Sequence, residues 1–254
     1  MQLVHHYSSS GWHELSLPPP DAPLQHMPQI KWGQPAHLFS PSFWRFQHWV
    51  EIELEPKQAP RCQLGEGGLL EEIIACLLGG HGLPAETSLA YFSRMKSTGF
   101  LHEKPKTPEV VEDFLKEPVQ VGGSLRRYRF WRTKAKAIWA ILTKHREDIE
   151  RIESSLAEPR QTRDKLTKFP GIGLKTASWI CRNWLNNDDL AVLDIHILRS
   201  LSKLGCSVAS VQTPRHYFEA ESHFLALSHS LGIPTRSLDL VMWAITRQLP
   251  TNML

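Results

Sequence analysis

Lys175 and Asp194 are a lysine and a carboxylate in local settings that suit nucleophilic catalysis, and Asp194 is the nineteenth residue after Lys175. Lys175 comes two residues after the second glycine of a Pro-Gly-Ile-Gly segment, where a helix is predicted to begin. The positive end of a helix and partial desolvation both favour the neutral amine. A neutral amine can attack the C1′ carbon of a sugar and form a Schiff base. A lysine considered alone is usually a solvated surface charge, so this interpretation depends on Asp194.

Asp194 directly precedes the apolar residues Ile195, Ile197 and Leu198. On local grounds it is the N-cap of a helix, because a short carboxylate satisfies the free amides of a first turn. An N-cap carboxylate stays ionised, so it can also stabilise positive charge on a sugar and help to relay protons. The two roles are compatible.

The segment 169–177 predicts the end of one helix, a glycine turn and the start of a second helix. Gly171 and Gly173 can adopt positive φ without a Cβ penalty and allow another backbone to come close. The amides around them and the positive end of the second helix would form an anion site. Such a site binds phosphate without reading base sequence.

Two pairs at i,i+4 spacing, Lys175 with Trp179 and Asp239 with Trp243, each lie on one helix face. A base flipped out of DNA needs aromatic faces on either side and a polar group at its edge. Trp179 and Trp243 are candidates for those faces, although a tryptophan at helical spacing is more often part of a core. Asp239 can accept hydrogen bonds from the N1–H and N2–H of guanine, which a pyrimidine does not offer.

Together these residues resemble the helix-hairpin-helix (HhH-GPD) DNA glycosylases, in particular the bifunctional 8-oxoguanine DNA glycosylase/AP lyases. The resemblance rests on the apolar-Pro-Gly-apolar-Gly pattern, on Lys175 and on the aspartate 19 residues later. Trp179 and the Asp239-x-x-x-Trp243 motif are similar to the archaeal type, whereas the 19-residue spacing follows the human-like branch. The resemblance implies removal of 8-oxoguanine from duplex DNA through a Schiff base on Lys175 and β-elimination, with Asp194 assisting and without metal or cofactor.

The resemblance adds two weaker candidates. His196 occupies a position that touches a DNA phosphate in relatives, and Gln34 falls in a region that borders the base pocket in bacterial relatives. Two alternatives stay open. One is the same chemistry on another base, such as an oxidised pyrimidine or a phage-modified base. The other is a helix-hairpin-helix module that binds DNA without catalysis.

The hydrophobic pattern predicts a mainly α, two-lobed helix-hairpin-helix glycosylase fold with its active cleft between the lobes, because no stretch shows sustained alternation. Pro18–Pro20 and the surrounding polar residues predict an extended N-terminal arm over residues 1–40, without regular structure, packed on the core. The glycosylase core spans 41–254. We expect a helical lobe over about 60–160, the helix-hairpin-helix unit over about 162–182, and the remaining helices over 194–250.

Composition limits the partners and the compartment. A net charge of +3 and a pI near 8.7 permit a nucleic-acid partner without requiring one. The four cysteines are scattered without ligand spacing, which favours a reducing cytoplasm, at the nucleoid in a bacterium. No apolar run approaches the ~18 residues of a membrane helix. We therefore expect a cytoplasmic monomer that binds double-stranded DNA containing oxidised guanine and no membrane.

Overall fold

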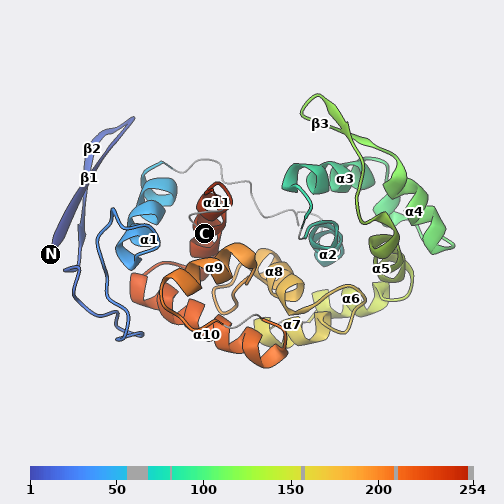
Figure 1. Ribbon diagram of the computed structural model, residues 1–254. Helices are drawn as coiled ribbons and strands as arrows, with labels where there is room; N and C mark the ends of the chain where they lie inside the picture. The colour runs from blue at the N-terminus through green and yellow to red at the C-terminus, as the bar shows by residue number, and fades with distance from the viewer. Residues whose placement is uncertain (56–67, 81, 156–157, 209–210, 251–254) are drawn as a thin grey trace. The chain divides into compact units, whose positions relative to one another are not determined.

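The computed structural model describes residues 1–55, 68–80, 82–155, 158–208 and 211–250. The described chain is mainly helical, as predicted, and it divides into two compact units (Figure 1). Unit 1 combines Met1–Arg61 with Asn187–Leu254, and unit 2 is Cys62–Asn186. Within the described ranges, no helix is long and apolar enough to cross a membrane.

Unit 1 is built around a helix near the C-terminal end of the chain. Its elements are β1 (Gln2–Ser8), β2 (Gly11–Leu17), α1 (Pro41–His48), the π-helix η1 (Trp49–Leu54), α9 (Ile195–Lys203), α10 (Pro214–Leu231) and α11 (Thr235–Thr246). Helix α11 packs against α1, α9 and α10. The first turn of α11 is fixed by Asp188, whose carboxylate accepts hydrogen bonds from the backbone N and from Nη1 of Arg236, both at 2.9 Å.

The prediction that residues 1–40 lack regular structure is wrong for residues 2–17. Strands β1 and β2 pair antiparallel from Gln2↔Leu17 to Ser8↔Gly11. In both strands, exposed side chains alternate with less exposed ones. The exposed face carries the aromatic residues Tyr7 and Trp12, so the sequence does not alternate between polar and apolar residues. Gln2 anchors the hairpin by donating to Ser42 Oγ at 3.2 Å at the start of α1. The boundary of the arm at residue 40 stays a prediction.

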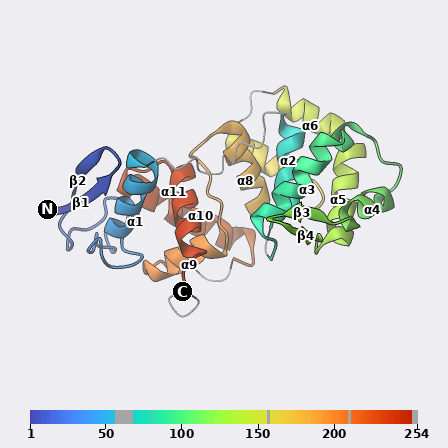
Figure 2. The ribbon, with the colours of Figure 1, turned by 90° about the horizontal axis from the view of Figure 1, so that it is seen from above.

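Unit 2 surrounds a buried helix. Its elements are α2 (Leu69–Leu78), α3 (Ala85–Ser97), the 3-10 helix η2 (Phe100–His102), α4 (Pro108–Lys116), β3 (Val119–Val121), β4 (Ser124–Arg126), α5 (Trp131–Thr143), α6 (Arg146–Glu153), α7 (Pro159–Leu166) and α8 (Leu174–Leu185). Helix α2 is apolar on nearly every side, as expected of a fully buried helix. It packs against α3, α5, α6 and α8 (Figure 2). The predicted start of the helical lobe near residue 60 lies outside the described residues.

A second short hairpin, β3–β4, accompanies the helices of unit 2. Gly122 and Gly123 connect the strands with φ values of 53° and 79°. A two-residue hairpin turn requires positive φ at both central positions, which glycine adopts without strain. Tyr91 of α3 holds this hairpin by donating its hydroxyl to the carbonyl of Glu117 at 2.8 Å.

The hairpin between α7 and α8 contains one glycine that the structure requires. Gly171 has φ of +78°, and a Cβ there would lie 2.9 Å from Ala137 Cβ and 3.3 Å from Leu77 Cδ2. Of the two glycines that can adopt positive φ, Gly171 does so and Gly173 does not. Gly173 has φ of −93° because it is the extended N-cap residue of α8. No atom lies within 4 Å of a Cβ built on it.

We predict that Gly171→Ala destabilises the protein by about 2–4 kcal/mol, through a strained left-handed residue and a clash with α2 and α5. Gly173→Ala is the matched control, because it has ordinary φ and open space. Urea denaturation of both variants measures the difference. Equal stability of the two would show that the close contact at Gly171 does not exist in solution.

Candidate functional site

Lys175 and Trp179 lie together on α8 in unit 2, as the i,i+4 spacing predicts. The Nζ atom of Lys175 is 5.8 Å from the centroid of the Trp179 ring, and both residues are half-buried. No side chain caps α8, whose N-cap is Gly173. The first amides of α8 have no partner within their own helix, so the end of the hairpin offers N–H donors to an anion.

Gly79 fixes the Trp179 ring, a contact that the sequence did not predict. Gly79 is the C-cap of α2. A Cβ on Gly79 would lie 2.9 Å from Cη2 and 3.0 Å from Cζ3 of Trp179. The backbone of α2 therefore lies directly against the indole. His81, in the same glycine-rich segment, lies outside the described residues.

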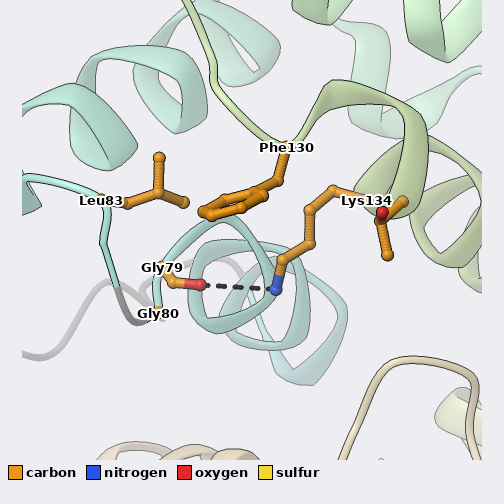
Figure 3. A pocket seen from close by; sticks show the side chains of 6 residues that line it. Gly79, Gly80, Leu83, Phe130 and Lys134 are labelled. Atoms are coloured by element: carbon orange, nitrogen blue, oxygen red, sulfur yellow. Dashed lines mark hydrogen bonds between the residues drawn. The ribbon is translucent and has the colours of Figure 1, made fainter.

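A cavity of about 240 Å³ is lined in part by this glycine segment (Figure 3). Its lining residues come from the end of α2 and the start of α5: Gly79, Gly80, Leu83, Phe130, Thr133 and Lys134. The side chain of Lys134 extends along the cavity and donates to the Gly79 carbonyl at 3.4 Å. Lys134 was not among the site residues predicted from the sequence.

A buried polar network joins α2 to α8 behind the candidate site. Glu72 is fully buried, and its Oε1 accepts from Asn183 Nδ2 at 2.6 Å and from Cys76 Sγ at 3.3 Å. Asn183 Oδ1 in turn accepts from Arg182 Nη2 at 3.0 Å. Burial raises the pKa of the Glu72 carboxyl, and the two hydrogen bonds partly oppose that rise. The network fixes α8, and therefore the helix that carries Lys175, against α2.

Asp194 caps α9 in unit 1, which confirms the predicted N-cap. Its Oδ1 accepts from the backbone N of His196 at 2.9 Å and from that of Ile197 at 3.0 Å. Both Asp194 and His196 remain partly exposed. The carboxylate is thus held by its own helix while one oxygen, Oδ2, takes no part in these two bonds.

Asp239 and Trp243 follow each other at i,i+4 on α11. Asp239 is 2% exposed, whereas Trp243 is half-buried with Arg247 Cζ 4.4 Å from its ring centroid. Gln34 is exposed in the turn before α1, where its carbonyl accepts from Ser40 Oγ at 2.7 Å. The structure thus brings Lys175 and Trp179 together in unit 2 and places the other polar candidates in unit 1. The cleft that unites the two sets stays a prediction.

The basic stretch before α5 combines packing with exposed charge. Tyr128 is buried and donates its hydroxyl to the Leu78 carbonyl at 2.6 Å. Its neighbours Arg127 and Arg129 are exposed. They line a second cavity of about 560 Å³ together with Lys116, Tyr128 and Trp131. The aromatic residue therefore anchors the segment while its arginines remain available to a polyanion.

The fold and the matching sequence are shared with known proteins. The family model described as 8-oxoguanine DNA glycosylase matches residues 65–233. The 8-oxoguanine DNA glycosylase/AP lyase of Sulfurisphaera tokodaii is 27% identical over 175 residues, which cover 68% of this chain and 78% of the relative. The crystal structure of the Methanocaldococcus jannaschii 8-oxoguanine DNA glycosylase has a TM-score of 0.63 at 24% identity. That match covers 85% of this chain and 98% of the other.

A second structure of the Methanocaldococcus jannaschii enzyme, in complex with 15mer DNA containing 8-oxoguanine, has a TM-score of 0.62 at 25% identity over 80% of this chain and 96% of that one. The fold and the hairpin before α8 are those of a helix-hairpin-helix DNA glycosylase. The family model matches more than half of the residues of this chain, so the chain belongs to the 8-oxoguanine DNA glycosylase family.

We predict that Asp194→Ala lowers the free energy of unfolding by about 1 kcal/mol, because α9 loses its cap. Asp194→Asn keeps the cap, since an amide oxygen also accepts from first-turn amides, and should unfold like the wild type. Urea denaturation distinguishes the two variants. If both variants lose the same stability, the capping bonds to His196 and Ile197 are not what Asp194 contributes to folding.

Proposed function

We propose that the protein is a bifunctional DNA glycosylase/AP lyase that removes 8-oxoguanine from duplex DNA. Its membership of the family supports this function, as do relatives named 8-oxoguanine DNA glycosylase/AP lyase. The observation that carries the proposal is Lys175 in the first turn of α8, an uncapped helix that directly follows the glycine hairpin. A module that only binds DNA has no need of a lysine there.

In the proposed reaction, the Lys175 amine attacks C1′ of the damaged nucleotide and the base departs with the electron pair of the glycosidic bond. The resulting Schiff base acidifies the C2′ proton, and β-elimination then breaks the strand on the 3′ side. The Asp194 carboxylate stabilises the positive charge that develops on the sugar. Gly171, Gly173 and the α8 amides hold a phosphate, and His196 holds another.

Recognition of the base is assigned to a second group of side chains. Trp179 and Trp243 offer aromatic faces to a flipped base. Asp239 accepts from the N1–H and N2–H of the purine, and Gln34 is a weaker candidate at the pocket border. Asp239 is 2% exposed. An oxidised pyrimidine does not offer these two donors, so a role for Asp239 in binding the base favours a guanine lesion.

We also propose that the protein works in a reducing compartment, as cytoplasmic repair requires. Cys76, Cys181 and Cys206 are all free and buried, which supports this location. Burial raises the pKa of the Cys181 thiol to about 12 and that of Cys206 to about 11. These thiols are therefore unreactive at neutral pH. Cys62 lies outside the described residues.

We predict a covalent protein–DNA band when the wild type is treated with borohydride on a duplex carrying 8-oxoguanine opposite cytosine. Lys175→Gln should give no band, because its amide cannot form a Schiff base. A band with an abasic duplex but none with 8-oxoguanine would retain the lyase chemistry and reject the lesion. Absence of a band with either duplex would reject the enzyme and leave the DNA-binding module.

Asp239→Ala tests the choice of base. We expect 8-oxoguanine excision to fall on the order of 10- to 100-fold, the effect of losing charge-assisted hydrogen bonds worth about 1.5–3 kcal/mol. Schiff-base formation on an abasic duplex should be unchanged, and it serves as the internal control for folding. Single-turnover rates on the two duplexes give the comparison. Equal losses on both would refute a role for Asp239 in recognising the base.

A further inference from the structure

Residues 118–146 of unit 2 carry an uneven share of the charge of the chain. This stretch contains eight of the 29 Lys and Arg residues and none of the 26 Asp and Glu residues. The rest of the chain therefore has more acidic than basic side chains, although the whole chain has a net charge of +3. Positive charge concentrated in this way indicates an anionic partner at this part of unit 2.

Three arginines of this stretch surround one hollow in the surface of unit 2. Arg127 and Arg129 line the cavity of about 560 Å³, and Trp131 lines it with them. Arg132 lies next to this group, because its Cζ is 4.6 Å from the centroid of the Trp131 ring. All three arginines are exposed. We call Arg127, Arg129 and Arg132 the arginine surface.

The arginine surface has no carboxylate of its own. Among the residues that the structure describes, none of its guanidinium groups lies within salt-bridge distance of an acidic side chain. Lys116, which lines the same hollow, differs because its Nζ is 3.0 Å from Asp113 Oδ1. Cations without a counter-ion in the protein can neutralise phosphates and release the ions condensed on DNA.

Two tyrosines fix the backbone that carries these arginines. The hydroxyl of Tyr91 accepts from the backbone N of Tyr128 at 3.0 Å, and Tyr128 donates its own hydroxyl to the Leu78 carbonyl at 2.6 Å. Tyr128 stands between Arg127 and Arg129 in the sequence, so both side chains extend from an anchored backbone. A backbone that is already ordered loses less conformational entropy when its side chains bind a ligand.

The chemistry of the hollow suits phosphate better than an apolar protein partner. A guanidinium group matches two phosphate oxygens at once. The ring of Trp131 has Lys116 Nζ and Arg132 Cζ each 4.6 Å from its centroid. Because cations lie over the ring, it offers little of the apolar face that the centre of a protein interface requires.

We propose that the arginine surface binds the phosphates of undamaged duplex DNA, so that the protein stays on DNA before it reaches a lesion. This inference rests on the proposed function, because it takes DNA as the substrate. The proposed function assigns phosphate contacts only to the hairpin before α8 and to His196. Phosphate contacts carry no sequence information, so this surface should bind damaged and undamaged duplexes equally.

The test is the salt dependence of binding to an undamaged duplex, measured by fluorescence anisotropy between about 50 and 200 mM salt. Arg127→Gln/Arg129→Gln should reduce the slope of log K against log salt by about 1.8, about 0.9 for each arginine. Arg127→Lys/Arg129→Lys keeps both charges and should keep the wild-type slope. Arg151→Gln/Arg215→Gln is the matched control, because it removes two exposed arginines that already pair with carboxylates.

Two further measurements separate this inference from the proposed function. In a Lys175→Gln background, which cannot form a Schiff base, Arg127→Gln/Arg129→Gln should lose the same slope on a duplex carrying 8-oxoguanine. With Lys175 present and the protein at saturation, borohydride trapping on an abasic duplex should proceed at the wild-type rate. Normal trapping also shows that the double variant is folded.

Each alternative result has a distinct meaning. An unchanged slope in Arg127→Gln/Arg129→Gln, with normal trapping, overturns the inference and assigns the arginines to another partner, such as an acidic protein. A loss confined to the 8-oxoguanine duplex assigns them to the lesion and also overturns it. An equal loss of slope in the control double variant shows an effect of net charge alone, with the same consequence. Absence of trapping in the wild type contradicts the proposed function instead.

Discussion

The site depends on a steric constraint at the hairpin turn, where Gly171 leaves room for a hydrogen atom and not for a methyl group. The turn presses against Leu77 of α2 and Ala137 of α5. Helix α8 begins only three residues later, at Leu174. The start of α8, and with it Lys175, is therefore located by backbone contact with two packed helices. Such contact is stiffer than a hydrogen bond between exposed side chains, because close-packed interiors yield little.

Helix α2 supports the part of the candidate site that lies in unit 2. Its end contacts Trp179 through Gly79, and its middle bonds to Asn183 of α8 through Glu72. Apolar packing alone specifies the register between two helices weakly, because side chains of many shapes can pack together. Glu72 Oε1 accepts from Asn183 only when the two side chains lie opposite each other, so this buried hydrogen bond favours one register of α8 over its neighbours.

The sequence predicted features whose signals are local. The cap at Asp194 was predicted from the apolar residues that follow it. Helix α2 carries an equally local signal in its apolar run and the glycine that ends it. The strands β1 and β2 were missed because Trp12 and Tyr7 face solvent. Strands β3 and β4 have three residues each, too few for alternation to show, although Gly122-Gly123 was a usable turn signal. The contacts of Gly79 and Lys134 join segments about 55 to 100 residues apart, and no local pattern predicts such contacts.

The two proposed catalytic residues lie at the N-terminal ends of helices, and only one of these ends is capped by a side chain. Asp194 accepts hydrogen bonds from two first-turn amides of α9, so its own carboxylate caps that helix. Helix α8 has no side-chain cap, and its first turn carries a lysine instead of an acid. A cation at that end opposes the helix dipole and weakens the helix. A phosphate bound at this end would supply the negative charge that the dipole favours. The sequence around Lys175 thus gives up helix stability at the place where the proposed chemistry brings DNA.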